Sequence, residues 1–169
     1  MSLAAPGTRI RGNETYAVAM GSDVRSAAYA RLIVRVRGLE VRFEAGRAVE
    51  VRADDGEDLM KAQVAADNGA ARLGEVALVD GHSRVGKTGL VFYDTLFDEN
   101  ASSHIALGAA ITHCIQGASE VTPEERHARG VNHSSIHTDF MIGSPELVIS
   151  GVTVSGDEVP ILRNGDWVL

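Results

Sequence analysis

The sequence predicts an α+β fold: a single domain built on a largely antiparallel, curved sheet with two or three short helices. Three observations predict it. Candidate strands outnumber candidate helices, most neighbouring elements are separated by turns of hairpin length, and 169 residues provide one hydrophobic core rather than two. Apolar residues make up 44% of the chain and charged residues 23%, which are ordinary values for a globular protein.

The first third of the chain predicts mainly strands, at residues 15–20, 30–36, 39–44 and 47–52. The last two alternate apolar and charged side chains on either side of Ala45-Gly46, which is typical of a hairpin. Asp54 and Asp55 follow, and their carboxylates can accept hydrogen bonds at the N-cap of a helix. We therefore expect a helix over residues 56–66.

The rest of the chain predicts shorter elements, with strands at residues 75–79, 136–142, 147–154 and 159–162. Thr122 and Glu125 have the spacing of a capping box, and Pro123 stands at the first helical position. A short helix should therefore run to Gly130. A glycine-rich loop separates the strand at 75–79 from the later elements.

The composition excludes several classes of partner. A net charge of −7 argues against binding to nucleic acid or to an anionic membrane. No apolar run reaches the roughly 20 residues that span a bilayer, and the first residues lack the features of a secretory signal. The single cysteine, Cys114, excludes an intrachain disulfide and a thiolate zinc cluster. We expect a cytoplasmic protein, with residues 1–3 derived from a vector and residues 4–169 forming the domain.

His137 and Asp139 are the first candidates for a metal site. Residues two apart on a strand point to the same face, so this imidazole and this carboxylate should project together. Ile136 and Phe140 lie on the opposite face, where a core would bury them. A divalent cation explains the pair, although a solvated pair on the protein surface is an alternative that the spacing alone leaves open.

Glu75 and His104 are two further candidates. Glu75 heads an apolar strand, and His104 follows a segment of acidic and small residues. A mixture of carboxylate and imidazole ligands suits Zn²⁺, Co²⁺ or Mn²⁺, and carboxylates can bridge two such ions. The alternatives are an ion pair of Glu75 with Arg72 and a buried, hydrogen-bonded His104.

Residues 81–88 (GHSRVGKT) fit the phosphate-binding pattern G-x-x-x-x-G-K-[ST] and follow an apolar strand. Lys87 and Thr88 would then contact a nucleoside triphosphate and Mg²⁺. A P-loop must open a helix, however, and the pattern here is followed by Gly89 and strand-forming residues. A nucleotide-binding protein is therefore kept only as an alternative.

Several longer segments resemble the thermophilic metalloaminopeptidase family, aminopeptidases T and S. They are residues 73–79 (LGEVALV), 89–102 (GLVFYDTLFDENAS), 104–108 (HIALG), 137–143 (HTDFMIG) and 160–167 (PILRNGDW). The segments occur in the family's order from about Ala5 to Leu169. The resemblance implies a homodimer with two divalent ions (zinc, cobalt, or magnesium or manganese) that removes amino-terminal residues from peptides.

The resemblance also implies roles for individual residues. Glu75, His104, His137 and Asp139 fall on four of the family's metal ligands, and Glu75 is counted among the catalytic residues as well. Beside these ligands, Glu99 and Asp98 are the nearest candidates in the sequence to carry a proton to the leaving amine, and capping of their loop is the alternative role for both.

Three departures from the family bear on activity. The family's first ligand is a glutamate in a segment that would precede Ala5, its amino-terminal domain has no counterpart here, and a tyrosine of the family is replaced by Ile111. We expect the isolated chain to be inactive or weakly active. A non-catalytic dimerisation domain is the remaining alternative.

Overall fold

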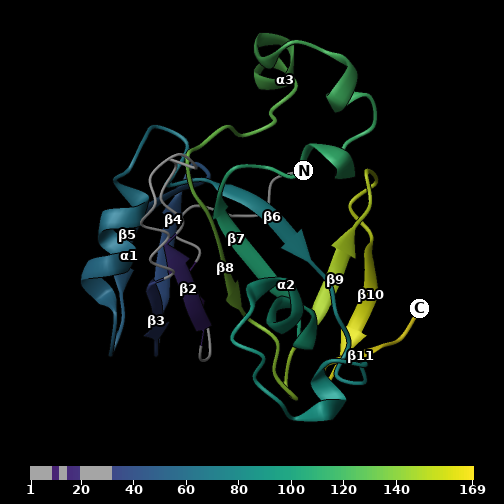
Figure 1. Ribbon diagram of the computed structural model, residues 1–169. Coiled ribbons are helices and arrows are strands. Elements are labelled where there is room, and N and C mark those ends of the chain that lie inside the picture. The colour runs from purple at the N-terminus through teal and green to yellow at the C-terminus, as the bar shows by residue number, and fades with distance from the viewer. Residues whose placement is uncertain (1–8, 12–14, 20–31) are drawn as a thin grey trace.

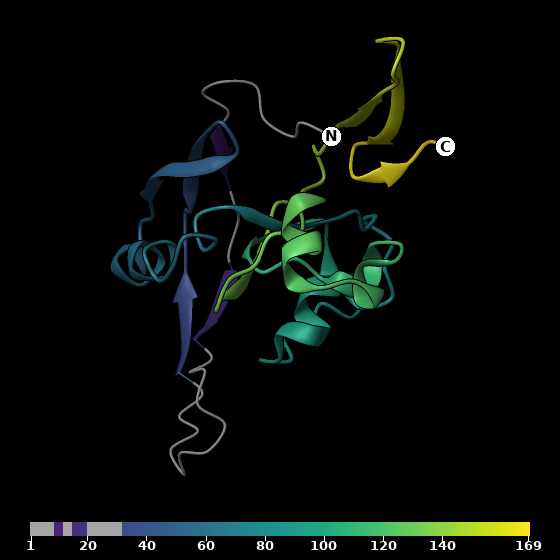
Figure 2. The same cartoon turned by 90° about the horizontal axis from the view of Figure 1, so that it is seen from above.

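A computed structural model of the chain describes residues 9–11, 15–19 and 32–169. Within these residues it confirms an α+β fold, in which every strand pairing is antiparallel and the helices are short. The predicted alignment of the family with Ala5, and the ends of the predicted strands at residues 20 and 30–31, lie outside the described residues. Figures 1 and 2 show the arrangement from two directions.

The strands form four small sheets. Their orders are β1-β4-β5, β2-β3, β6-β7-β8 and β9-β10-β11. The bounds of the strands are Arg9–Arg11 (β1), Thr15–Ala19 (β2), Leu32–Val36 (β3), Glu40–Glu44 (β4), Arg47–Arg52 (β5), Leu73–Ala77 (β6), His104–Gly108 (β7), His137–Met141 (β8), Ile149–Val152 (β9), Glu158–Arg163 (β10) and Asp166–Trp167 (β11).

The helical segments lie between these strands. They are the α-helices α1 (Glu57–Val64), α2 (Thr95–Asp98) and α3 (Pro123–Ala128), and the 3₁₀ turns η1 (Gly86–Thr88), η2 (Glu99–Ala101), η3 (Thr112–Cys114) and η4 (Ala118–Glu120). No helix in the described part of the chain is long and apolar enough to cross a membrane.

The β4–β5 hairpin and helix α3 form as their sequences predict. Ala45 and Gly46 both have positive φ, 47° and 73°, as the tight turn of a twisted hairpin requires. At α3, Thr122 Oγ1 accepts a hydrogen bond from the backbone N–H of Glu125 at 3.3 Å. The Glu125 carboxylate in turn accepts one from the Thr122 N–H at 2.9 Å. Both hydrogen bonds of this capping box are therefore present.

Helix α1 begins at Glu57, close to the predicted start at Gly56, but the predicted capping by Asp54 and Asp55 is wrong. Its N-cap is Gly56, at a φ of 77°, and no side chain caps the helix there. Instead Glu57, inside the first turn, reaches back and accepts a hydrogen bond from the backbone N–H of Ala53 at 3.0 Å. The left-handed backbone at Gly56 separates Asp54 and Asp55 from the helical N–H groups. The helix also ends at Val64, earlier than predicted.

Strand β7, like the short elements β1 and α2, was not predicted from the sequence pattern. All of its five residues are buried, because it is the central strand of the β6-β7-β8 sheet. A strand covered on both faces loses the alternation that marks a half-exposed strand. The connections on either side of β7 are long, over residues 78–103 and 109–136, and they carry α2 and α3. In Figure 1 these connections extend well beyond the sheet.

The hydrophobic core lies between the β6-β7-β8 sheet and the elements β3 to α1. Ile105, Leu107 and Phe140 from the first form one buried cluster with residues of the second that include Phe43 and Met60. Figure 2 shows α1 and the C-terminal strands β9–β11 on opposite sides of the molecule. The core therefore fixes one face of the β6-β7-β8 sheet and leaves the other face for the long connections.

Candidate metal centre

Strand pairing places four polar side chains on one face of the β6-β7-β8 sheet. Ala106 in β7 is the Cα partner of Glu75 on one side and of Asp139 on the other. Residues directly opposite in paired strands share a face, as do residues two apart along one strand. His104 and His137 each lie two residues before one of these positions, so their imidazoles share that face. The small Ala106 side chain leaves space between them.

The imidazoles and carboxylates meet at short distances. Glu75 Oε2 lies 3.2 Å from Nε2 of His137, and Glu75 Oε1 lies 3.6 Å from Nε2 of His104. Asp139 Oδ1 is 3.4 Å from the same His137 nitrogen. The side chains of His104 and Asp139 are only 3% and 6% exposed. The structure thus brings the His137 and Asp139 pair together with Glu75 and His104, which are far from that pair and from each other along the chain.

Backbone carbonyls orient both imidazoles. Nδ1 of His104 is 3.1 Å from the carbonyl oxygen of Ser102, and Nδ1 of His137 is 2.7 Å from that of Ala109. A carbonyl can only accept a hydrogen bond, so Nδ1 carries the hydrogen in each ring. In the neutral form Nε2 then offers its lone pair to the carboxylate-lined space. Metal-binding histidines are commonly held in this way.

Glu99 joins the same group from η2. Two sets of three side chains have ligand atoms within 4.8 Å of one another: Glu75, His137 and Asp139 form one, and Glu99, His104 and Asp139 form the other. Asp139 belongs to both. The sequence indicated Glu99 only as a proton carrier, because its place one residue after α2 gives no sign that it approaches β7 and β8.

Asp98, the alternative to Glu99, has a different role. Its carboxylate accepts hydrogen bonds from the backbone N–H groups of Phe92, at 2.8 Å, and Asp94, at 3.1 Å. It therefore closes the loop that precedes α2. This leaves Glu99 as the carboxylate of the pair that lies in the centre.

The charges of the centre perturb one another. The hydrogen bond with Asp139 raises the pKa of His137 to about 9, against an opposing effect of burial, and the hydrogen bond to Ala109 adds to the rise. Burial raises the pKa of the Glu99 carboxyl, and the nearby Asp139 raises it further. Three carboxylates and two imidazoles around one space match the mixed oxygen and nitrogen ligands that Zn²⁺, Co²⁺ and Mn²⁺ bind.

Comparison with known proteins decides the family. The model of the thermophilic metalloprotease family (M29) matches residues 25–167. This chain belongs to that family. Aminopeptidase T of Thermus aquaticus is 51% identical, and aminopeptidase PepS of Streptococcus thermophilus is 47% identical. Each alignment covers 134 residues, which are 79% of this chain and 32% of the relative.

A solved structure shows the same relationship. Wild-type AmpT from Thermus thermophilus superposes with a TM-score of 0.74 at 42% sequence identity, over 95% of this chain and 36% of that one. The M29 chain therefore spans about a third of the length of the relatives that it matches.

The start of β8, which carries His137, is held by a residue that sequence reasoning missed. Asp67 Oδ2 accepts hydrogen bonds from Ser134 Oγ at 3.0 Å and from both the backbone N–H and Oγ of Ser135 at 2.6 Å. The hydrogen bonds from Ser135 hold the pKa of the Asp67 carboxyl well below its usual range. In this M29 chain Asp67 thus joins the loop after α1 to the entry of β8.

The phosphate-binding pattern at residues 81–88 does not form a P-loop. Gly86–Thr88 makes one 3₁₀ turn, which ends at Gly89 with a φ of 62°. The backbone N–H groups that would cradle a phosphate already donate within the protein, from Gly81, His82, Ser83, Gly86, Lys87 and Thr88. The strand before the pattern, β6, is paired antiparallel. The geometry therefore removes the support for the nucleotide-binding alternative.

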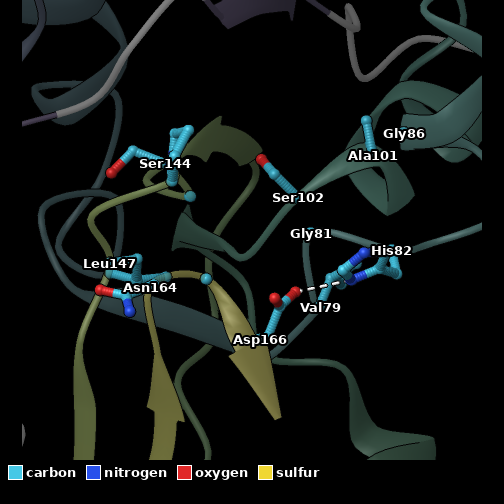
Figure 3. Close-up of a pocket in the computed structure, with 13 residues that line it drawn as sticks. Val79, Gly81, His82, Gly86, Ala101, Ser102, Ser144, Leu147, Asn164 and Asp166 are labelled. Atoms are coloured by element: carbon cyan, nitrogen blue, oxygen red, sulfur yellow. Dashed lines mark hydrogen bonds and ion pairs between the residues drawn. The ribbon is translucent and has the colours of Figure 1, made fainter.

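The same loop lines a pocket of about 400 Å³ against the C-terminal strands. Figure 3 shows His82 and Asp166 joined across it, with His82 Nδ1 2.7 Å from Asp166 Oδ1. The backbone N–H of Gly81 also donates to the carbonyl of Gly165 at 2.8 Å. These contacts fasten the loop to the β10–β11 turn, which gives residues 81–88 a structural role.

Proposed function

We propose that this M29 chain carries the metal centre of an aminopeptidase that removes the amino-terminal residue from peptides. One observation carries the proposal: two imidazoles and two carboxylates on one sheet face, together with Glu99 of η2, form two clusters that share Asp139. The reaction is inferred from the matched relatives, which are named as aminopeptidases.

Glu75, His104, His137 and Asp139 would hold two divalent ions, with zinc, cobalt, magnesium and manganese as the candidates. The two oxygens of Glu75 face different imidazoles, so this one carboxylate could supply a ligand atom beside each of them. When bound, such ions lower the pKa of water toward neutrality, polarise the scissile carbonyl and accept the lone pair of the substrate's free α-amine.

The residues of the chain then have separate tasks. The carbonyls of Ser102 and Ala109 keep the Nε2 atoms of His104 and His137 directed into the centre. Glu99 lies beside His104 and would pass a proton to the leaving amine, which must be protonated to depart. The near-complete burial of His104 and Asp139 limits the water that competes for the ligands.

Metal content tests the proposal without depending on turnover by the isolated chain. After exposure to excess Co²⁺ or Zn²⁺ and desalting, elemental analysis should find bound metal in this chain, and two ions per chain in an aminopeptidase that carries this segment together with the family's first glutamate. A variant with both His104→Ala and His137→Ala should retain none. Release of p-nitroaniline from leucine p-nitroanilide, by an aminopeptidase that carries this segment, should stop with a chelator. Absence of bound metal and chelator-resistant hydrolysis would each contradict the assignment.

For the complete enzyme we also propose a homodimer, which the resemblance implies, and a cytoplasmic location, which the chain's single cysteine favours. Light scattering coupled to size-exclusion chromatography measures the first. We also propose that the replacement of the family's tyrosine by Ile111 lowers turnover, because isoleucine has no hydroxyl to stabilise an oxyanion. Ile111→Tyr should then raise kcat without changing metal content.

A further inference from the structure

A second pocket, of about 650 Å³, lies away from the metal centre. The β4–β5 turn, the segment that leads into β6 and the segment between α3 and β8 form its walls. Figure 1 shows this last segment running from α3 back toward the β4–β5 hairpin. None of the five metal-centre residues lines the pocket.

The ionisable side chains that line the pocket are all basic, in a chain whose net charge is −7. They are Arg47, Arg72, His127 and His133. No aspartate or glutamate is among the described lining residues. Basic side chains are therefore concentrated at this pocket although the protein as a whole is negatively charged, and this arrangement calls for an explanation.

The two arginines stand directly opposite each other. Arg47 and Arg72 are partners in an antiparallel bridge, and the adjacent hydrogen bond from Ala48 N to Ala71 O, at 2.7 Å, fixes their register. Like charges in opposed positions destabilise a pair of strands. Nη1 of Arg72 also reaches the hairpin turn, 3.7 Å from where a Cβ on Gly46 would lie.

Nearby carboxylates are engaged elsewhere. Glu44 is the hairpin partner of Arg47, but its carboxylate contacts Arg42. Glu50 also binds Arg42, with 2.9 Å between the two groups. Within the described part of the chain, the hydrogen bond found for the Arg47 guanidinium runs to the neutral carbonyl of Asn68, at 2.9 Å.

Close contacts and hydrogen bonds join the backbone segments that form the wall of the pocket. A Cβ on Gly69 would lie 1.9 Å from the carbonyl oxygen of His133, so the two backbone segments are in direct contact. Asn132 Nδ2 donates to the carbonyls of Gly69, at 2.9 Å, and Gly108, at 2.6 Å. The basic side chains therefore extend from a fixed frame, which lowers the entropy cost of binding a ligand.

We propose that this pocket binds an oxyanion with two negative charges, of the kind carried by a phosphate group. Two guanidinium groups balance two charges, and their planar N–H forks match phosphate oxygens. His127 and His133 also line the pocket, and their imidazoles would add N–H donors. The bound anion would remove the repulsion between Arg47 and Arg72 that the protein otherwise bears.

The test uses the whole chain in chelator, so that the anion cannot bind through a metal ion. Inorganic phosphate is titrated at constant ionic strength, with calorimetry and thermal melting as readouts. The wild type should bind phosphate saturably and melt at a higher temperature with it. Arg47→Gln and Arg72→Gln should each weaken binding by about tenfold or more, as loss of a charge-assisted pair implies. Arg84→Gln, an exposed arginine outside the pocket, should bind as the wild type does.

Two further measurements separate a ligand site from a structural role. In phosphate-free buffer of low ionic strength, Arg72→Gln should melt at or above the wild-type temperature, because the repulsion is relieved. Arg72→Lys keeps the charge without the fork and should bind phosphate with intermediate affinity. The proposal is overturned by a phosphate response that does not saturate, by wild-type affinity in both glutamine variants, or by acetate binding as tightly as phosphate.

Discussion

Asp139→Asn should remove most of the stabilisation that metal ions give this chain. Asp139 is 6% exposed and is the side chain that both clusters of candidate ligands share. Asparagine has nearly the same shape but no negative charge, so both clusters lose an anionic ligand while the packing beside Phe140 stays intact. The effect should therefore appear in metal binding more than in folding.

The size of the effect follows from linkage. A ligand at 100 times its Kd stabilises the folded state by about 2.7 kcal/mol. For a chain of this length each kcal/mol raises Tm by about 2–4 °C, so one bound ion should raise Tm by about 5–11 °C. We expect Zn²⁺ or Co²⁺ to produce at least this rise in the wild type, and less than about 2 °C in Asp139→Asn at the same concentration.

Differential scanning calorimetry with and without metal measures both values. Asp58→Asn, an exposed aspartate in the first turn of α1, is the matched control and should keep the full rise. Circular dichroism of the metal-free Asp139→Asn variant should match the wild type. An undiminished metal-dependent rise in folded Asp139→Asn would show that the shared carboxylate is not a ligand, and the arrangement proposed for the centre would be wrong.

Glu99→Gln should lower kcat of an active M29 enzyme by about 10²–10⁴-fold. Elemental analysis should find the same metal content as in the wild type. A loss of metal would show that Glu99 is a ligand and not a proton carrier. Because the pKa of His137 is raised to about 9, its protonated form should stabilise the metal-free chain fully below about pH 6.5. That stabilisation should fade as pH rises through 9 in a series of melts, while metal affinity, measured in the same buffers, should strengthen over this interval as the competing proton leaves. Asp67→Ala should lower the free energy of unfolding in urea by about 2–3 kcal/mol, since hydrogen bonds to a charged group are lost. It should also weaken metal binding by about 10-fold because the entry of β8 loosens. If metal affinity is unchanged, Asp67 contributes to stability alone. Phe140→Ala should lower the free energy of unfolding in urea by about 3–5 kcal/mol because the ring of Phe140 is fully buried. A decrease below 1 kcal/mol would contradict the place of Phe140 in the core.

The parts of the fold that sequence predicted correctly are the ones that local chemistry decides. The turn at Ala45-Gly46 needs two residues with positive φ, and the capping box at Thr122 and Glu125 uses groups three residues apart. Alternation likewise predicted β8. The N-cap of α1 was predicted wrongly because a glycine conformation, not the nearest carboxylate, set where the helix begins.

The sequence by itself determined which side chains could bind a metal and that His137 and Asp139 share a face, because the period of a strand is local. Only the tertiary structure decided that Glu75 and Asp139 flank the same Ala106 and that Glu99 reaches His104. It also decided which carbonyls orient the imidazoles. These relations depend on the register between strands separated by long connections. That register is fixed when the buried strand β7 packs its other face into the core, and no spacing along the chain encodes it.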